Sequence, residues 1–438
     1  MLHRLNAFLI ARRTAVTLIA VLLVLMALGY ILPQQTVTGP GPNRLGVPGP
    51  VLALSAAIGF DRMWSSAVFL GTLGACLISL TAALAHSARL AWRRSTAPII
   101  GAGSLGSQHV SLQSEVVASH LRASGYRPVR PVDGAARFIR HPWGLWGGFV
   151  LHLGLVITTA AAIVVLATET WAIVGLAEGE VHTSGSPWSA EEPARFADPI
   201  VLSEDLRLDS VTPEYWDNNE LRQVTSDITF IAPDGSEVPV TVSVNGSRVF
   251  RGVRFFQDQQ FGRAFFIEIE RDGEVLRERV EMNWPAEPAE PVYFDVTLDD
   301  GALLQLKHYA DVSYESMTGE PELWGRWTQD GVSTESVVLP RGTPVQVGPA
   351  LVELKFHRIW TNIILVRDYG IPVLFGGFFL VFIGSGLIYL TVPREAFVAT
   401  EPGGGSRIWL RAARFPDMYA EEFDRLIARL RAESEGTP

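Results

Sequence analysis

One apolar stretch, from Trp143 to about Leu166, constrains the fold of this chain more than any other part of its sequence. Its length of about two dozen residues is enough for a helix to cross a hydrocarbon core of roughly 30 Å. It contains one ionisable residue well inside, His152, which lies near the bilayer midplane at a rise of about 1.5 Å per residue. An ionisable side chain at that depth is costly, so it normally faces a bundle interior and has a partner. In one continuous helix, His141 would share the face of His152.

Three further apolar stretches bring the predicted number of membrane-spanning helices to four. They cover Ala15–Leu32, Ser66–Ala85 and Ile371–Val392. The first exceeds a signal-peptide core and lacks a small-residue cleavage site, so we interpret it as an uncleaved helix. The second carries Gly71, Ala75 and Ser79 at a spacing of four, a pattern that favours close helix packing.

The distribution of arginine predicts the orientation of these spans. Residues 86–142 hold eight arginines against Glu115 and Asp133, and the tail after the fourth span is also rich in arginine. By the positive-inside rule both regions and the N-terminus are cytoplasmic. Within the loop, helical spacing of apolar residues around Leu112–Leu121 predicts a short amphipathic helix.

The predicted domains follow from these spans. They are a basic cytoplasmic N-terminus (1–14), helices one and two with a short outer loop (15–85), a basic cytoplasmic loop (86–142), helix three (143–167), an extracytoplasmic β-rich domain (168–370), helix four (371–392) and a cytoplasmic tail (393–438).

The outer segment differs from the rest of the chain in charge and pattern. Residues 169–368 contain 35 acidic and 16 basic side chains, so a basic surface for nucleic acid is not expected there. Short runs alternate apolar and polar residues, so that Phe265, Ile267 and Ile269 would face a core while Glu268 and Glu270 face water. Five Asp-Gly or Asn-Gly pairs favour tight hairpins. The predicted fold class is an integral membrane protein with four transmembrane helices plus a large extracytoplasmic all-β domain.

Several stretches, taken in order along the chain, resemble one family. They are ILPQ after the first span, GFDRMWSSAVFLGTLGAC at the second, LWGGFVLHLGL in the third with AEGEV after it, VNGSRVFRGVRFFQDQQFG in the outer segment, and VRDYGIPVLFGGFFLVFIGSGL at the fourth span. Their order and the four-helix layout are similar to those of the ResB-like family, membrane proteins of system II cytochrome c biogenesis. The resemblance covers nearly the whole chain.

The resemblance implies a role in haem handling. Such proteins work with a CcsA/ResC-type membrane partner that carries a tryptophan-rich haem-binding motif. Together they move haem outward and present it for attachment to apocytochrome c, whose cysteines a thioredoxin-like thiol reductase keeps reduced. The resemblance therefore implies a subunit of a system II cytochrome c synthetase, a multi-pass protein in the lipid bilayer of the bacterial cytoplasmic (inner) membrane. It also implies haem as a transient cofactor shared with its partner. It leaves open whether the subunit is co-catalytic or non-catalytic.

A second hypothesis is a membrane scaffold or assembly factor whose β domain binds secreted client proteins without handling haem. The single cysteine, Cys76, excludes a CxxC redox pair and a CxxCH haem-attachment site in either case. We predict no catalytic residue and no metal site in the chain itself.

Two residues in the spans are candidates for haem contact. A haem site requires an axial ligand, often a histidine nitrogen, in an apolar slot. By resemblance, His152 matches the third-span histidine of the family and is the main candidate; the alternative is a histidine bonded to the backbone or a hydroxyl of another helix, without haem. Cys76 matches a second-span cysteine of the family, although a lone buried cysteine is usually a small apolar side chain.

Other polar residues near the spans are expected to have structural roles. We predict that His86 and His141 are interfacial, that His308 and His357 are ordinary residues of the β domain, and that Asp368 belongs to a capping turn before the fourth span.

Overall fold

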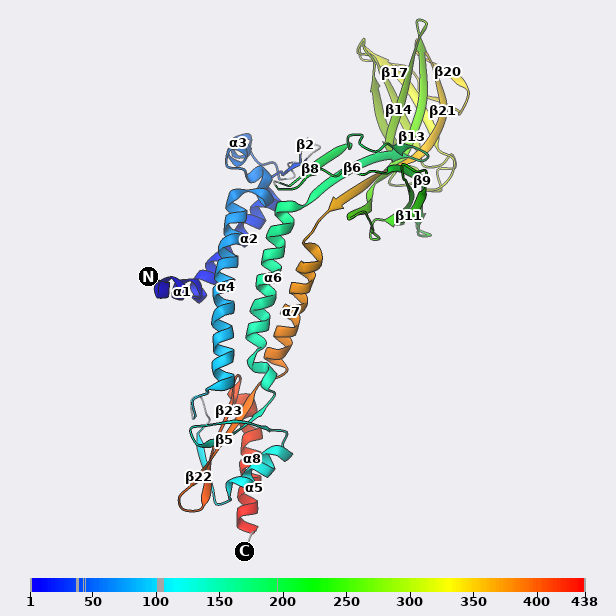
Figure 1. The fold of residues 1–438 in the computed structure, drawn as a ribbon. Coiled ribbons are helices and arrows are strands. Elements are labelled where there is room, and N and C mark those ends of the chain that lie inside the picture. Colours follow the sequence, from blue (N-terminus) through cyan, green and yellow to red (C-terminus); the bar gives the residue numbers. More distant parts are fainter. Residues whose placement is uncertain are drawn as a thin grey trace. The chain divides into compact units, whose positions relative to one another are not determined.

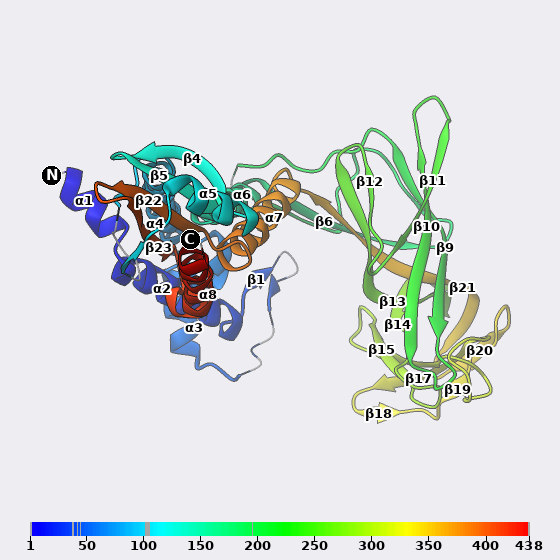
Figure 2. The same cartoon turned by 90° about the horizontal axis from the view of Figure 1, so that it is seen from below.

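The computed structural model describes residues 2–36, 39–41, 43, 45–100, 106–194 and 196–436, and the chain forms two compact units. The first unit comprises Met1–Gln35, Pro40–Ala167 and Tyr369–Pro438, and the second comprises Thr36–Gly39 and Thr168–Asp368. The first holds the helices, and the second is almost entirely β-structure (Figures 1 and 2).

Four helices of the first unit are long and apolar enough to cross a membrane, which confirms the predicted number. They are α2 (Arg12–Ile31), α4 (Ala67–Thr96), α6 (Gly147–Thr168) and α7 (Ile371–Tyr389) (Figure 1). Helix α4 continues beyond the predicted end at Ala85, because the alanine, leucine and arginine residues that follow the apolar run also favour helix. The shorter elements of this region are α1 (Leu2–Leu9), α3 (Gly49–Ala57), η1 (Phe60–Ser65), η2 (Pro142–Leu145), β1 (Gln35–Thr36) and β2 (Gly39–Pro40).

Helices α6 and α7 pack together through small residues that recur every seven positions. These residues are Gly147, Gly154 and Ala161 on α6, and Gly370, Gly377 and Gly384 at the start of α7 and along it. A Cβ atom added to Gly154 would lie 2.6 Å from the Val381 nitrogen, and one added to Gly377 would lie 2.8 Å from the Thr158 nitrogen. The two backbones are therefore nearly in contact, as is typical of helix pairs with small residues at a membrane interface. We call this contact the glycine seam.

The small-residue face predicted on α4 is used only in part. The Ser79 hydroxyl donates to the Leu9 carbonyl at 2.7 Å, which ties α4 to α1. A Cβ atom added to Gly71 would meet no described atom within 4 Å. The close packing expected from this face occurs instead at the glycine seam.

His141 does not share a helix with His152, so the predicted common face is wrong. His141 has a positive φ of 58°, Pro142 begins η2, and α6 starts only at Gly147. The physical reason is the proline, whose ring disfavours helical backbone angles in the preceding residue.

The loop and the tail, which were predicted as separate segments, form one small domain. Its five-stranded antiparallel sheet has the order β3-β23-β22-β5-β4. The strands are β3 (Ser107–Val110), β4 (Arg127–Val132), β5 (Ala135–Arg140), β22 (Arg394–Glu401) and β23 (Gly405–Ala412). Helices α5 (Ser114–Ala123) and α8 (Pro416–Gly436) cover one face, and the core between them includes Leu121, Phe138, Ile408 and Leu430 (Figure 1). Helix α5 confirms the amphipathic helix predicted in the loop.

The second unit consists of three antiparallel sheets, which confirms the predicted β-rich region. Their orders are β11-β10-β9-β7, then β12-β13-β21-β6-β8 with β14 and β20 at its long strands, and β15-β16-β17-β18 with β19. The strands are β6 (Thr170–Ala177), β7 (Val181–His182), β8 (Ala190–Pro193), β9 (Asp205–Tyr215), β10 (Leu221–Ile231), β11 (Glu237–Ser243), β12 (Arg248–Phe250), β13 (Val253–Arg271), β14 (Glu274–Asn283), β15 (Val292–Thr297), β16 (Leu303–Tyr309), β17 (Glu322–Gln329), β18 (Val332–Ser333), β19 (Val337–Val338), β20 (Pro344–Val347) and β21 (Ala350–Arg367).

The paired long strands β13 and β21 contribute to two separate apolar cores. Val253 and Phe255, in the first half of β13, pack with residues of β9 and β10. Phe265, Ile267 and Ile269, in the second half, pack with residues of β16 and β17. These last three side chains are at most 2% exposed, which confirms the alternation predicted for this run. A break in the β13–β21 pairing between Gln257 and Phe261 separates the halves.

Four of the five predicted hairpin turns are also present. Gly235, Gly273, Gly301 and Gly331 each have a φ between 79° and 84° and join neighbouring antiparallel strands. In the fifth pair, Asn245-Gly246, the glycine does not have a positive φ.

The glycine seam predicts different effects for two adjacent glycines of α7. In Gly377→Val, the new side chain would collide with the backbone of α6, and overpacking of this kind costs about 1–3 kcal/mol. The matched control is Gly376→Val, because a Cβ atom there meets no described atom within 4 Å. We expect a lower melting temperature for Gly377→Val alone, measured on purified protein in detergent. Equal stability of the two variants would contradict the seam.

Candidate functional site

His152 lies on the side of α6 that faces away from the glycine seam. At about 100° per residue, it is about 140° around the helix from the line through Gly147 and Gly154. Its side chain is half-buried, and its Nδ1 is 2.7 Å from the carbonyl oxygen of Gly148. A carbonyl oxygen only accepts hydrogen bonds, so Nδ1 carries the proton and donates it. The lone pair of the neutral ring is therefore on Nε2.

This tautomer suits a metal ligand. Histidines that bind metals usually donate their other ring N–H to a backbone carbonyl or a carboxylate, which fixes the ring and makes the ligating nitrogen more basic. The same bond also satisfies a polar group inside a span when no ligand is present. The alternative interpretation expected a bond to the backbone or a hydroxyl of another helix, whereas the bond found is to a carbonyl of α6 itself.

Cys76, the other predicted candidate, is buried in α4 with 9% exposure. Among the described residues, no group of three or more His, Cys, Asp or Glu side chains is arranged to hold a metal ion. The role of Cys76 in haem contact stays a prediction.

A groove between α4 and the start of α6 combines aromatic and basic side chains. Its volume is about 550 Å³, and it is lined by His86, Ala88, Arg89, Leu90, Trp92, Arg93, Trp146 and Phe149. We call it the His86 groove. Phe149 lies one helical turn before His152, and its ring meets that of Trp146 edge to face at 5.8 Å. The groove therefore opens on the same side of α6 as His152.

Sequence reasoning treated His86 as an isolated interfacial residue and missed this groove. His86, Arg89 and Arg93 have the spacing of one helix face, but that pattern has meaning only because α4 continues to Thr96. The predicted helix ended at Ala85, so these residues appeared to belong to a loop.

The chemistry of the groove and of His152 fits haem. Haem is a flat apolar ring whose iron takes an axial nitrogen ligand, and its two carboxylates match the planar fork of arginine. Aromatic walls, an imidazole and two guanidinium groups are present in the His86 groove, and His152 offers an Nε2 lone pair inside the span.

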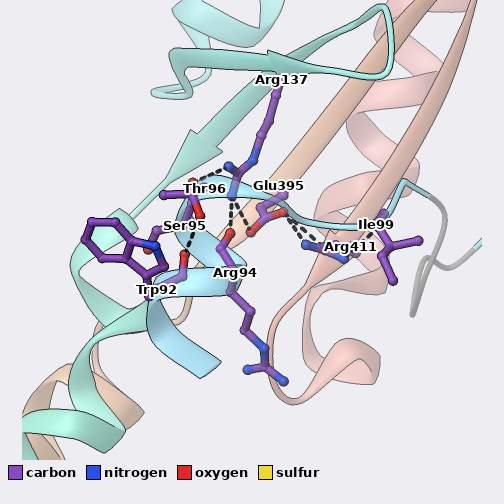
Figure 3. Close-up of polar contacts among 8 residues, drawn as sticks. All are labelled: Trp92, Arg94, Ser95, Thr96, Ile99, Arg137, Glu395 and Arg411. Carbon is purple, nitrogen blue, oxygen red and sulfur yellow. Dashed lines mark hydrogen bonds and ion pairs between the residues drawn. The ribbon is translucent and has the colours of Figure 1, made fainter. Parts of the chain in front are cut away.

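Glu395 of β22 is buried between two arginines of neighbouring strands (Figure 3). It accepts hydrogen bonds from Arg137 of β5 at 3.2 Å and from Arg411 of β23 at 2.6 and 3.0 Å. The exposed fraction of Glu395 is 1%, so its charge needs these partners. The cluster joins the loop strand to both strands of the tail.

The two arginines also bind the chain at the end of α4. Arg137 donates to the carbonyls of Ser95 at 2.7 Å and Arg94 at 2.8 Å, and Arg411 donates to the Ile99 carbonyl at 3.3 Å (Figure 3). The last carbonyls of a helix lack partners within the helix, and cationic side chains stabilise them. The loop-and-tail domain therefore fixes the end of the helix that carries one wall of the His86 groove.

The histidines of the second unit have structural surroundings. His308 is fully buried, its two ring nitrogens lie near the carbonyls of Tyr309 and Asn283, and burial lowers its pKa to about 4. His357 pairs with Glu320 at 3.2 Å, and burial is the main cause of its lowered pKa. Both are domain residues, in agreement with the sequence interpretation.

Helix α7 begins at Ile371, with Gly370 as its N-cap residue. Asp368, two residues before this N-cap, lies 3.9 Å from Arg254 of β13. Its part in a capping turn with Gly370 stays a prediction. The chain takes glycine at the N-cap because Val165 and the Ala161 carbonyl of α6 leave no space for a side chain there.

The fold and the site define a class of protein: a membrane protein of four apolar helices with a large β-rich region between the third and the fourth. The model of the ResB-like family matches residues 12–283, which is more than half of the chain. This chain belongs to the ResB-like family. The matched region contains both Cys76 and His152, and membership supports a role in cytochrome c biogenesis.

Among solved structures, the chain is similar to one described as cytochrome c heme lyase CcmF. The TM-score is 0.23 and the sequence identity 11%, over 85% of this chain and 39% of that one. The chain thus spans well under half of that protein, and a likeness this low carries no functional argument. The comparison with curated proteins gives no match.

The Glu395 cluster predicts a specific loss of structure. In Glu395→Ala, the buried Arg137 and the partly buried Arg411 lose their counter-charge, which costs about 3–5 kcal/mol for a buried pair. We expect faster cleavage of the tail in limited proteolysis and a lower melting temperature. Glu421→Ala, on the exposed surface of α8, is the control and should behave as the unmodified protein. A tail of unchanged resistance in Glu395→Ala would show that the cluster does not hold the domain.

Proposed function

We propose that this chain is a subunit of a system II cytochrome c synthetase. With a CcsA/ResC-type partner, it delivers haem across the membrane and assists its attachment to apocytochrome c. Membership of the ResB-like family supports the pathway. The observation that carries the haem role is His152, an imidazole inside a span with Nδ1 held by the Gly148 carbonyl and its lone pair on Nε2.

The position of His152 on α6 supports a shared site. The glycine seam occupies one side of α6, and His152 is on the other, where a half-buried imidazole is costly against lipid. At the start of α6 this side faces α4 across the His86 groove, and a helix of a second membrane protein would complete an apolar slot around His152. In this proposal His152 supplies one axial ligand, and the partner supplies the rest of the slot.

The His86 groove supports a route to that slot. It lies between the end of α4 and the start of α6, next to the loop-and-tail domain, and it opens on the same side of α6 as His152. In this proposal haem enters here, with its ring against Trp92, Trp146 and Phe149. Arg89 and Arg93 then hold the haem carboxylates at the membrane boundary, where charged groups are tolerated.

The haem role predicts the behaviour of His152→Ala. We expect normal insertion, because removing a polar group from a span does not impair it, together with less haem retained by the purified complex and less mature c-type cytochrome. Added imidazole should restore part of the haem absorbance, since it can occupy a vacated axial position. Ser385→Ala is the control, because it removes a similar side-chain bond, from Ser385 to the Val381 carbonyl, within α7. Normal haem content and normal cytochrome yield in His152→Ala would favour the scaffold hypothesis.

The proposed direction of transport predicts an orientation. The large β region is extracytoplasmic, and the loop-and-tail domain is cytoplasmic, because its two segments carry most of the arginines outside the β region. Alkaline phosphatase fused after Glu178 should be active, and the same enzyme fused after Gly134, in the turn between β4 and β5, should be inactive. The reverse pattern would overturn the orientation.

A further inference from the structure

The second unit contains a pocket that neither haem handling nor membrane insertion uses. It lies between the β9–β10 turn, the segment after β14 and the loop around Met317, and its volume is about 720 Å³. Its lining residues are Tyr215, Asn218, Asn219, Glu220, Leu221, Phe261, Trp284, Pro285, Ala286, Glu287, Pro288 and Met317. We call it the Trp284 pocket.

The indole of Trp284 is held rigidly in this pocket. Its Nε1 donates to the Met317 carbonyl at 3.1 Å, and the Phe261 ring lies 5.3 Å away. The guanidinium of Arg263 lies 4.6 Å from the indole centre and donates to the Gly319 carbonyl at 2.8 Å. Arg263 is itself only 5% exposed, so its charge supports the indole and is not presented at the mouth. An aromatic surface fixed before binding avoids much of the entropy cost of ordering it later.

Charge indicates what the pocket accepts. Glu220 and Glu287 are exposed lining residues, and the pocket residues include no lysine, arginine or histidine. The surrounding segment 169–368 has 35 acidic and 16 basic residues, a net charge of −19. A field of this sign attracts cationic partners and repels anionic ones, including free haem with its carboxylates.

The lining combines features that suit a polypeptide more than a small molecule. Asn218 accepts a hydrogen bond from the Glu220 nitrogen at 3.2 Å, and Asn219 donates to the Glu315 carbonyl at 3.4 Å, so the other end of each amide suits a peptide backbone. Pro285 and Pro288 stiffen the lining because their φ angles are fixed. The aromatic floor suits one apolar side chain, and the carboxylates on the rim suit basic residues beside it.

We infer that the Trp284 pocket binds an extended, cationic polypeptide segment, with an apolar side chain on Trp284 and flanking lysines or arginines at Glu220 and Glu287. This inference deepens the proposed function and rests on it in one respect: an apocytochrome is the client only if the chain serves cytochrome c synthesis. Peptide binding itself is measured without haem, so the peptide-binding inference and the proposed haem function can fail separately.

The test uses the full chain in an uncharged detergent and a fluorescein-labelled probe peptide. The probe is a glycine-serine peptide with one leucine flanked by lysines, and binding is followed by fluorescence anisotropy with empty micelles subtracted. Two further peptides separate charge from apolar contact: one carries glutamate in place of lysine, and the other carries serine in place of leucine. We expect the lysine-leucine peptide to bind most tightly and its affinity to fall as salt is added.

Two variants locate the site. Glu220→Gln with Glu287→Gln should weaken binding of the probe about fivefold, the size expected for two partly exposed charge pairs. The control is Glu274→Gln with Glu335→Gln, which removes the same charge from exposed residues outside the pocket. Ala286→Trp adds bulk at an exposed lining position, and we expect it to abolish binding without lowering the melting temperature.

The outcomes decide the inference. Equal binding of the lysine and glutamate peptides would overturn it, as would equal weakening in the pocket variant and its control, which would indicate a general field. Unchanged affinity in a folded Ala286→Trp protein would also overturn it. Haem retained by the complex should be the same in all these variants. The peptide-binding result can therefore be judged whether or not His152→Ala loses haem.

Discussion

The buried charge of Glu395 is the constraint on which the first unit depends. A carboxylate that is 1% exposed is tolerated only with its partners in place, and those partners, Arg137 and Arg411, come from segments more than 250 residues apart in sequence. Because the same arginines bind carbonyls at the end of α4, one cluster joins the loop, the tail and a membrane helix. The tail is thus an integral part of the first unit. Because the cluster holds the end of α4, it also fixes one wall of the His86 groove.

The glycine seam has a similar effect inside the membrane region. By committing one side of α6 to α7, it leaves Phe149 and His152 on the opposite side, where Phe149 lines the His86 groove together with α4. A costly imidazole on that side supports the proposal that a second membrane protein completes its surroundings. The seam therefore connects ordinary helix packing to the proposed sharing of haem with a partner.

In the second unit, the long strands β13 and β21 carry two cores and a break in pairing between them. Breaks of this kind redirect side chains, and Phe261, which follows it, lines the Trp284 pocket. The pocket is thus a product of the strand architecture, and its acidic rim matches the net charge of the segment. The two proposed ligands thus meet different chemistries: basic and aromatic side chains for haem, and acidic and aromatic side chains for a polypeptide.

The sequence by itself determined the number of spanning helices, the β-rich character of the region between the third and fourth, and the alternation at Phe265–Ile269, because each is a local pattern of hydrophobicity. It also identified His152 as a candidate for haem contact, since a lone histidine in an apolar span is visible without a structure. It could not determine that loop and tail share one sheet, because strand pairing between distant segments leaves no local signal. It likewise missed the His86 groove, because the apolar run of α4 ends at Ala85 and the residues beyond it could form either helix or loop. It also wrongly predicted that His141 shares a helix face with His152. Only the tertiary structure decided those points: the Glu395 cluster joins the loop to the tail, and the backbone at His141 and Pro142 separates His141 from α6. It also decided which side of α6 meets α7, through the glycines of the two helices.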